Sequence, residues 1–297
     1  MRLEKKATIV STSVAGLLVL MKMTVGILSG SIAVLASAID SFLDLIVSLF
    51  NFFALSRAED APDDDFNFGK SKMEPLAAVI EGTVISLSAM FILYEALVKI
   101  VHPREMQYMN ESIIVMLISI VITLFLVIFL NRVAKQTNNL VIKADALHYK
   151  TDIFSNAAVL VALGLVAFTE EQLIDAFIGM GIGIYMIYSS VPIIKEGVLM
   201  LLDAALPPED VQKIQNAISK HSVVTDYHYL MTRESGSHVF ISVHAVFNVT
   251  ISLYDAHLVA DKIEEEWRSL FADKQVHALV HMDPYDDSEI NEQESKL

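Results

Sequence analysis

Six apolar stretches fill most of the sequence before Pro207, and each is about as long as a bilayer is thick. A helix needs about 20 mainly apolar residues to cross the hydrocarbon core, and there every backbone N–H and C=O must be hydrogen-bonded within the protein. The sequence therefore predicts six membrane-spanning helices. Their expected limits are 7–28, 32–55, 76–101, 113–130, 140–168 and 173–194.

The apolar content is confined to one part of the chain. Of the 297 residues, 54% are hydrophobic, whereas a soluble domain is typically about 45–50% apolar. Because the excess ends near Pro207, we expect a six-span transmembrane domain over 1–206, a soluble domain over 207–284 and a disordered acidic tail over 285–297. The formal net charge of -15 argues against nucleic acid as a partner.

Beyond Pro207 the hydrophobic pattern becomes that of a soluble domain. Val211, Ile214 and Ile218 recur at helical spacing, whereas residues 238–247 alternate as a strand does. The order helix-strand-strand-helix-strand predicts a small α+β domain, with one sheet and its helices on one face. The expected helices are 209–221 and 253–271, and the expected strands are 226–233, 238–247 and 275–282.

Two pairs of ionisable residues lie inside apolar stretches, where such groups are costly and usually mark an ion path. Asp40 and Asp44 belong to the second stretch, and His148 and Asp152 to the fifth. The i, i+4 spacing places the members of each pair on one helix face, one turn apart. Three carboxylates and one imidazole are a suitable donor set for a tetrahedral divalent-metal site. We therefore predict a metal-transport site between these two spans.

The same donors favour an exchange of metal for protons. Either a bound cation or protons can compensate the carboxylates, and His148 is the natural proton carrier because metal binds only the neutral imidazole. One imidazole with three carboxylates suits zinc, ferrous iron, cobalt or cadmium better than copper(I). The chain has no cysteine, which excludes thiolate ligands. Zinc is the leading ion, with ferrous iron and cadmium as alternatives.

Three further charges accompany these pairs. Asp145, three residues before His148, either orients the imidazole or lies at the aqueous boundary near the helix end. Lys22 in the first span and Glu81 in the third receive no role from the sequence.

The distribution of lysine and arginine around the spans predicts the orientation. One side of the predicted bundle carries most of these residues, and the other carries Lys99 and Arg104. The bias predicts that both termini are cytoplasmic. The residues on the basic side are Arg2, Lys5, Lys6, Arg57, Lys70, Lys72, Arg132, Lys135 and Lys195.

Seven of the nine histidines follow residue 206. Several lie on different predicted elements, so that they can converge on one or two metal ions. The candidate ligands are His228, His244, His257, His281 and Asp283.

The paired motifs Asp40-x-x-x-Asp44 and His148-x-x-x-Asp152, the six spans and the C-terminal domain resemble the cation diffusion facilitators. The amino-acid sequence over residues 31–44, 69–76 and 145–152 is similar to that of the bacterial zinc and ferrous-iron efflux pumps of this family. The resemblance implies a homodimer in the inner membrane that exports divalent metal against inward proton movement. It also implies a metal pair in the cytoplasmic domain that acts as a sensor near the dimer interface.

One loop departs from the resemblance. The related pumps often carry metal-binding histidines between the second and third spans, whereas Phe66 and Lys70 occupy those places here. We therefore expect a solvated loop without a zinc site.

Other functions explain the charged residues less well. An intramembrane aspartyl protease would need a Gly-x-Gly-Asp context, and a di-iron oxidase would need Glu-x-x-His pairs; the sequence contains neither. We therefore do not expect an enzyme. A membrane-bound metal sensor without transport stays open as the alternative, although it leaves the intramembrane set unexplained.

Overall fold

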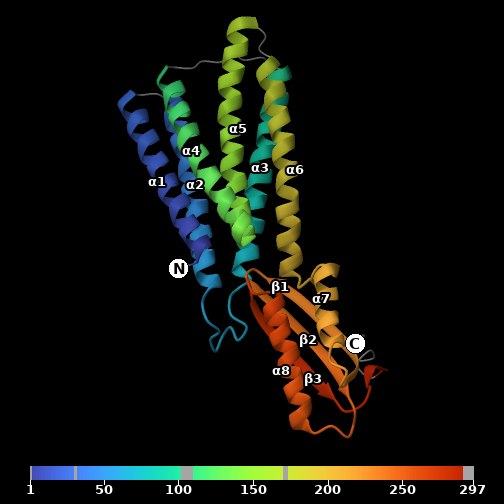
Figure 1. Cartoon of the computed structure of the whole chain (residues 1–297). Helices are drawn as coiled ribbons and strands as arrows, with labels where there is room; N and C mark the ends of the chain where they lie inside the picture. The colour runs from blue at the N-terminus through green and yellow to red at the C-terminus, as the bar shows by residue number, and fades with distance from the viewer. Residues whose placement is uncertain (1, 30–31, 102–109, 170–172, 290–297) are drawn as a thin grey trace. The chain divides into compact units, whose positions relative to one another are not determined.

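The computed structural model describes residues 2–29, 32–101, 110–169 and 173–289. The chain divides into two compact units after Val198, which lies in the last turns of the sixth helix (Figure 1). The boundary predicted from the sequence lies a little later, at the prolines that follow Leu206. Residues 290–297 of the predicted acidic tail lie outside the described residues.

The first unit consists of long helices. Within the described residues, five of them are long and apolar enough to cross a membrane. The helix that is not among these five is the fifth in chain order. It is 30 residues long, but its first half carries four charged residues, Lys143, Asp145, Lys150 and Asp152. The helices are α1 (Leu3–Ser29), α2 (Ile32–Ala58), α3 (Met73–Val101), α4 (Asn110–Thr137), α5 (Leu140–Thr169) and α6 (Leu173–Leu201).

Packing explains how the charged helix α5 is accommodated. It lies against both α3 and α4, while α1 packs on α2 and α4. Its first turns are buried among these neighbours, including Leu140, Val141 and Ile142. Charges on α5 therefore face protein groups or an internal cavity, as intramembrane charges usually do.

Small residues bring α3 and α6 close together. A Cβ atom on Gly183 would lie 2.7 Å from Leu93 Cγ, and one on Gly197 would lie 2.6 Å from Val79 Cγ2. A larger residue at either position would force a neighbouring side chain to shift, and small residues of this kind commonly let membrane helices approach each other closely.

The second unit has the predicted order helix-strand-strand-helix-strand (Figure 1). The antiparallel pair β1–β2 is joined by a hairpin in which Gly236 takes a φ of 57°, a conformation that glycine adopts easily. The second helix then returns the chain so that β3 pairs with β2 in parallel. The elements are α7 (Pro208–Ser219), β1 (Val224–Ser235), β2 (His238–Phe247), α8 (Leu253–Leu270) and β3 (Gln275–Asp283).

Alternate residues of β2 are apolar and lie in the core of this unit. Val239, Ile241 and Val243 are buried in one cluster with Ile263 and Trp267 of α8. The Trp267 indole N–H donates to the backbone carbonyl of Ile214 in α7 at 3.3 Å, which ties the two helices together. Because successive strand residues point to opposite faces, the intervening residues of β2, His244 among them, lie on the face away from the helices.

Candidate metal sites

The intramembrane candidates come together where α2 meets α5. His148 Nε2 lies 3.1 Å from Asp44 Oδ1 and 3.9 Å from Asp152 Oδ2. One donor atom from each of these three residues lies within 4.8 Å of the others. The two helices thus bring together two carboxylates and one imidazole, a set that suits a divalent metal ion.

Asp40, the fourth predicted ligand, lies outside this group. It is one turn before Asp44 on α2 and is exposed, and it lines the same cavity as the other three residues. The structure therefore brings three of the four predicted donors together and leaves the fourth facing the cavity.

This cavity has a volume of about 550 Å³. Its walls come mainly from the C-terminal halves of α1 and α3, the N-terminal halves of α2 and α4, and the middle of α5. Representative lining residues are Lys22, Ser37, Phe91, Ser119 and Asn156. These halves all belong to one end of the helix bundle, the end at which α1 leads to α2 and α3 leads to α4.

Exposure falls steeply from the cavity toward the opposite end of the bundle. The exposed fraction of the side chain is 34% for Asp152, 24% for Asp44 and 11% for His148. Asp145, one turn closer to the start of α5, is fully buried. The candidate metal-site residues therefore lie at the closed end of the cavity, where burial increases.

Beyond that closed end lies a buried polar layer. Asn51 of α2 donates to Glu81 Oε2 of α3 at 2.9 Å, and both residues are fully buried. Within the described part of the chain, Glu81 Oε1 and Asn51 Oδ1 are buried without a hydrogen-bond partner, whereas the Ser11 hydroxyl is close enough to act on the Asp145 carboxylate. Asp145 is the charge that acts most strongly on Glu81. The layer therefore contains more acceptors than donors, which is unusual in a protein interior.

Lys22, to which the sequence assigned no role, lines the cavity beside the carboxylates. Its ammonium group donates to Ser41 Oγ at 2.7 Å and to the Ser37 carbonyl at 3.4 Å, both on α2. The residue is only 7% exposed. Three acidic residues, Asp40, Asp44 and Asp152, line the same cavity.

The second group of candidates lies on the open face of the sheet. His228 of β1 is directly opposite His244 of β2, and His244 is opposite His281 of β3. Residues that are paired across neighbouring strands point to the same face, so the three imidazoles form one row across the sheet. The register of β1 shifts just after His228, where Tyr229 takes a φ of 53°. Such bulges often re-aim a side chain beside a functional site.

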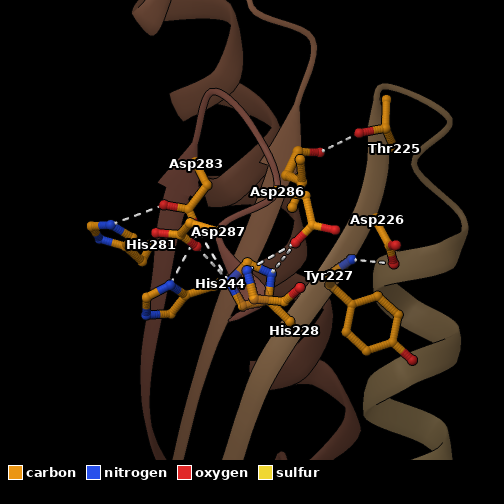
Figure 2. Close-up of polar contacts among 11 residues, drawn as sticks. Thr225, Asp226, Tyr227, His228, His244, His281, Asp283, Asp286 and Asp287 are labelled. Atoms are coloured by element: carbon orange, nitrogen blue, oxygen red, sulfur yellow. Dashed lines mark hydrogen bonds and ion pairs between the residues drawn. The ribbon is translucent and has the colours of Figure 1, made fainter. Parts of the chain in front are cut away.

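Carboxylates at the end of β3 complete this group (Figure 2). Asp283 Oδ2 lies 3.1 Å from His244 Nδ1, and Asp283 Oδ1 lies 3.1 Å from His281 Nε2. Asp287 Oδ1 lies 2.9 Å from His228 Nε2. His228, His244, Asp283 and Asp287 each offer one atom to a set in which all four atoms lie within 4.8 Å of one another. Two imidazoles and two carboxylates suit a tetrahedral divalent metal ion.

Asp287 was not among the residues predicted from the sequence. It belongs to the segment for which an acidic disordered tail was expected, and only the return of the chain after Asp283 brings it to His228. The adjacent Asp286 is exposed, and hydrogen bonds from Ser288 lower its pKa. An acidic residue shortly after a strand with predicted metal ligands was the one available signal.

Two of the predicted cytoplasmic ligands are not members of the four-residue group. His257 lies on α8, which packs on the other face of the sheet; its side chain is 61% exposed and faces Asp261 at 3.6 Å. His281 is equally exposed but is in contact with the group, because its ring centroid lies 4.5 Å from that of His244.

The loop between α2 and α3 is ordered by a lysine in place of histidines. Lys70 Nζ lies 2.8 Å from Asp63 Oδ2 and 4.6 Å from the centroid of the Phe66 ring. The other oxygen of Asp63 accepts from the backbone N–H groups of Asp65 and Phe66. These hydrogen bonds, the one from Lys70 foremost, lower the pKa of Asp63. The ammonium group of Lys70 thus supplies the positive charge that pairs with Asp63 in this loop.

Comparison with known proteins agrees with both units. The model of the cation efflux transmembrane domain matches residues 8–202, and that of the cytoplasmic domain of cation efflux proteins matches residues 206–285. The cation-efflux pump FieF of Citrobacter koseri is 36% identical over 283 residues, which are 95% of this chain and 93% of the relative. FieF pumps of Escherichia coli O1:K1 and of E. coli strain SMS-3-5 are 35% identical over the same length and with the same coverage. The chain therefore belongs to the cation diffusion facilitator family.

Proposed function

We propose that this protein exports a divalent metal ion, zinc foremost, across the cytoplasmic membrane in exchange for protons. The observation that supports this most is the meeting of Asp44, His148 and Asp152 at the closed end of a cavity between membrane helices. Ionisable groups at this depth are retained where they carry ions or protons. The proposed activity is transport, and no catalytic role is assigned to these residues.

The donor set supports the choice of ion. An imidazole among carboxylates favours zinc, with ferrous iron and cadmium as the other candidates, whereas an all-oxygen site would suit magnesium or manganese. Asp40 faces the same cavity from one turn away and is the fourth donor in our proposal.

Proton exchange follows from the position of His148 Nε2. The same nitrogen that faces Asp44 and Asp152 can carry either a proton or a metal ion, but not both. Metal entry therefore displaces a proton, and a proton that returns from the other side helps to displace the metal.

The sidedness of the cavity supports an outward-facing state. The basic residues near the ends of the spans favour cytoplasmic termini, and the cavity lies at the end of the bundle at which α1 leads to α2, opposite to the N-terminus. In our proposal, the buried layer of Asn51, Glu81 and Asp145 then separates the site from the cytoplasm.

We further propose that the protein is a homodimer and that its cytoplasmic domain binds metal through His228, His244, Asp283 and Asp287. Metal there would regulate transport only if it binds one conformational state more tightly than the other. This cluster is also the observation that favours the alternative function, a membrane-bound metal sensor without transport.

Metal flux into proteoliposomes under an imposed pH gradient tests the proposal. Zinc, ferrous iron, cadmium and manganese would be compared, with and without an ionophore that collapses the gradient. We expect zinc flux that falls when the gradient is collapsed. Zinc flux that is insensitive to the gradient would contradict proton exchange. If no ion is transported although the cytoplasmic domain binds zinc, the protein is a membrane-bound metal sensor and not a transporter.

A further inference from the structure

We propose that Lys22 is a resident counter-charge that sets the net charge of the transport site to match one divalent cation. The proposal rests on the proposed function of this site. It assigns a role to the one lysine among the residues that line the cavity.

The first observation is how Lys22 is held. Among the described residues, its ammonium group donates to neutral oxygens of α2, the Ser41 hydroxyl at 2.7 Å and the Ser37 carbonyl at 3.4 Å. These bonds place a positive charge in the cavity without occupying the carboxylate oxygens. The carboxylates therefore stay available to a metal ion while the lysine remains in place.

The second observation is which charges surround it. Asp40, Asp44 and Asp152 all line the same cavity as Lys22. With a neutral His148, three carboxylates and one ammonium group carry a net charge of two negative units. One divalent cation neutralises this set, and so do two protons.

The balance matters because uncompensated charge at membrane depth is costly. Without Lys22 the site would carry three negative units and would keep one of them after a divalent ion had bound. A divalent ion would then bind more tightly and leave more slowly. Lys22 thus allows the ion to be released as well as bound, which turnover requires.

A purely structural role is the competing explanation, since Lys22 also links α1 to α2 through Ser41. Three variants distinguish the charge-balancing role of Lys22 from a structural role. Lys22→Gln removes the charge and keeps a hydrogen-bond donor, Lys22→Arg keeps the charge, and Ser41→Ala removes the hydrogen bond and keeps the charge.

The experiment measures zinc flux into proteoliposomes over a range of zinc concentrations, together with the number of protons moved per zinc ion. For Lys22→Gln we expect KM to fall by roughly tenfold, because one unit charge acts across a partly solvated cavity, and the maximal rate to fall with it. We also expect more protons per zinc ion than in the native protein. Lys22→Arg and Ser41→Ala should keep a KM close to the native one.

A charge-balanced double variant gives the result that a structural role does not predict. Asp40→Asn alone removes a donor and a negative charge and should raise KM. Adding Lys22→Gln restores the net charge and should recover part of that loss, whereas a structural role predicts a further loss.

The outcomes are distinguishable from failure of the proposed function. If the native protein moves no metal, the transport proposal itself fails. If native flux depends on Asp44 but Lys22→Gln has the native KM and proton count, only the role of Lys22 is overturned. The same holds if Lys22→Arg is as defective as Lys22→Gln, or if Lys22→Gln worsens the Asp40→Asn variant.

Discussion

The imidazole of His148 and the carboxylate of Asp44 meet at 3.1 Å although 104 residues separate them in the sequence. The contact joins α2 to α5 at the closed end of the cavity, with Asp152 one turn further along α5. An isolated carboxylate at this depth would be costly, and the imidazole supplies its partner.

Replacing His148 by Gln should abolish proton-coupled zinc flux. Gln keeps a polar side chain of similar length, but it offers no nitrogen that exchanges a proton for a metal ion. Zinc affinity at the transport site should fall by at least about tenfold, as it does when groups that support a metal site are lost. Proteoliposome flux and zinc binding by calorimetry measure the two effects. Native flux in this variant would exclude the imidazole as a ligand.

Replacing Glu81 by Gln should stabilise the protein. Glu81 and Asp145 are fully buried, and among the described residues Glu81 Oε1 has no hydrogen-bond partner. Removing one acid relieves their repulsion while the amide can still accept from Asn51, which should raise the free energy of unfolding by about 1–2 kcal/mol. Thermal unfolding in detergent micelles measures this effect, with Glu95→Gln on the same helix as the control. A lower unfolding midpoint than that of the native protein would mean that the Glu81 carboxylate has a required partner.

The cytoplasmic cluster should depend on Asp287 and not on His257. Asp287→Asn and His244→Ala each remove a donor from the four-residue group and should weaken zinc binding there by more than about tenfold. His257→Ala should bind as the native protein does, because this side chain faces Asp261 on α8. Zinc titrations would be done in the Asp44→Asn background, so that the transport site contributes little. Equal loss in His257→Ala would place that histidine in the site.

Acid should weaken the C-terminal domain through His277. Burial, and next the Arg233 guanidinium, lower the pKa of His277 below its ordinary value of 6.5. The unfolded chain therefore binds a proton more readily than the folded one, so that stability is complete above pH 6.5 and declines as the pH falls from there toward the folded pKa. NMR of labelled imidazoles measures the titration directly. Arg233→Gln should raise the pKa of His277, and an unchanged or lower value would contradict the role of the guanidinium.

Much of the fold was predictable because the hydrophobic pattern changes period at Pro207. Long apolar runs require membrane helices, and the alternation over 238–247 both forms β2 and separates core residues from His244. Ionisable residues are informative inside apolar runs because little else explains them there. Asp44, His148 and Asp152 stand out for that reason.

Other parts of the candidate sites depend on packing that periodicity does not encode. The spans are apolar on most sides, so the sequence does not say that Lys22 of α1 faces Ser41 of α2. Nor does an acidic stretch after Asp283 indicate that Asp287 returns to His228. His257 has helical spacing that fits α8, but only the tertiary fold separates α8 from the row of imidazoles on the open face of the sheet.

The central claim is that the cluster of Asp44, His148 and Asp152 carries the transported ion. Its most direct test is zinc flux into proteoliposomes under a pH gradient, for the native protein, for Asp152→Asn and for Asp64→Asn. Asp64 is an exposed residue of the loop between α2 and α3 and serves as the matched control. We predict that Asp152→Asn loses zinc flux and that Asp64→Asn keeps it. Native flux in Asp152→Asn would contradict the account.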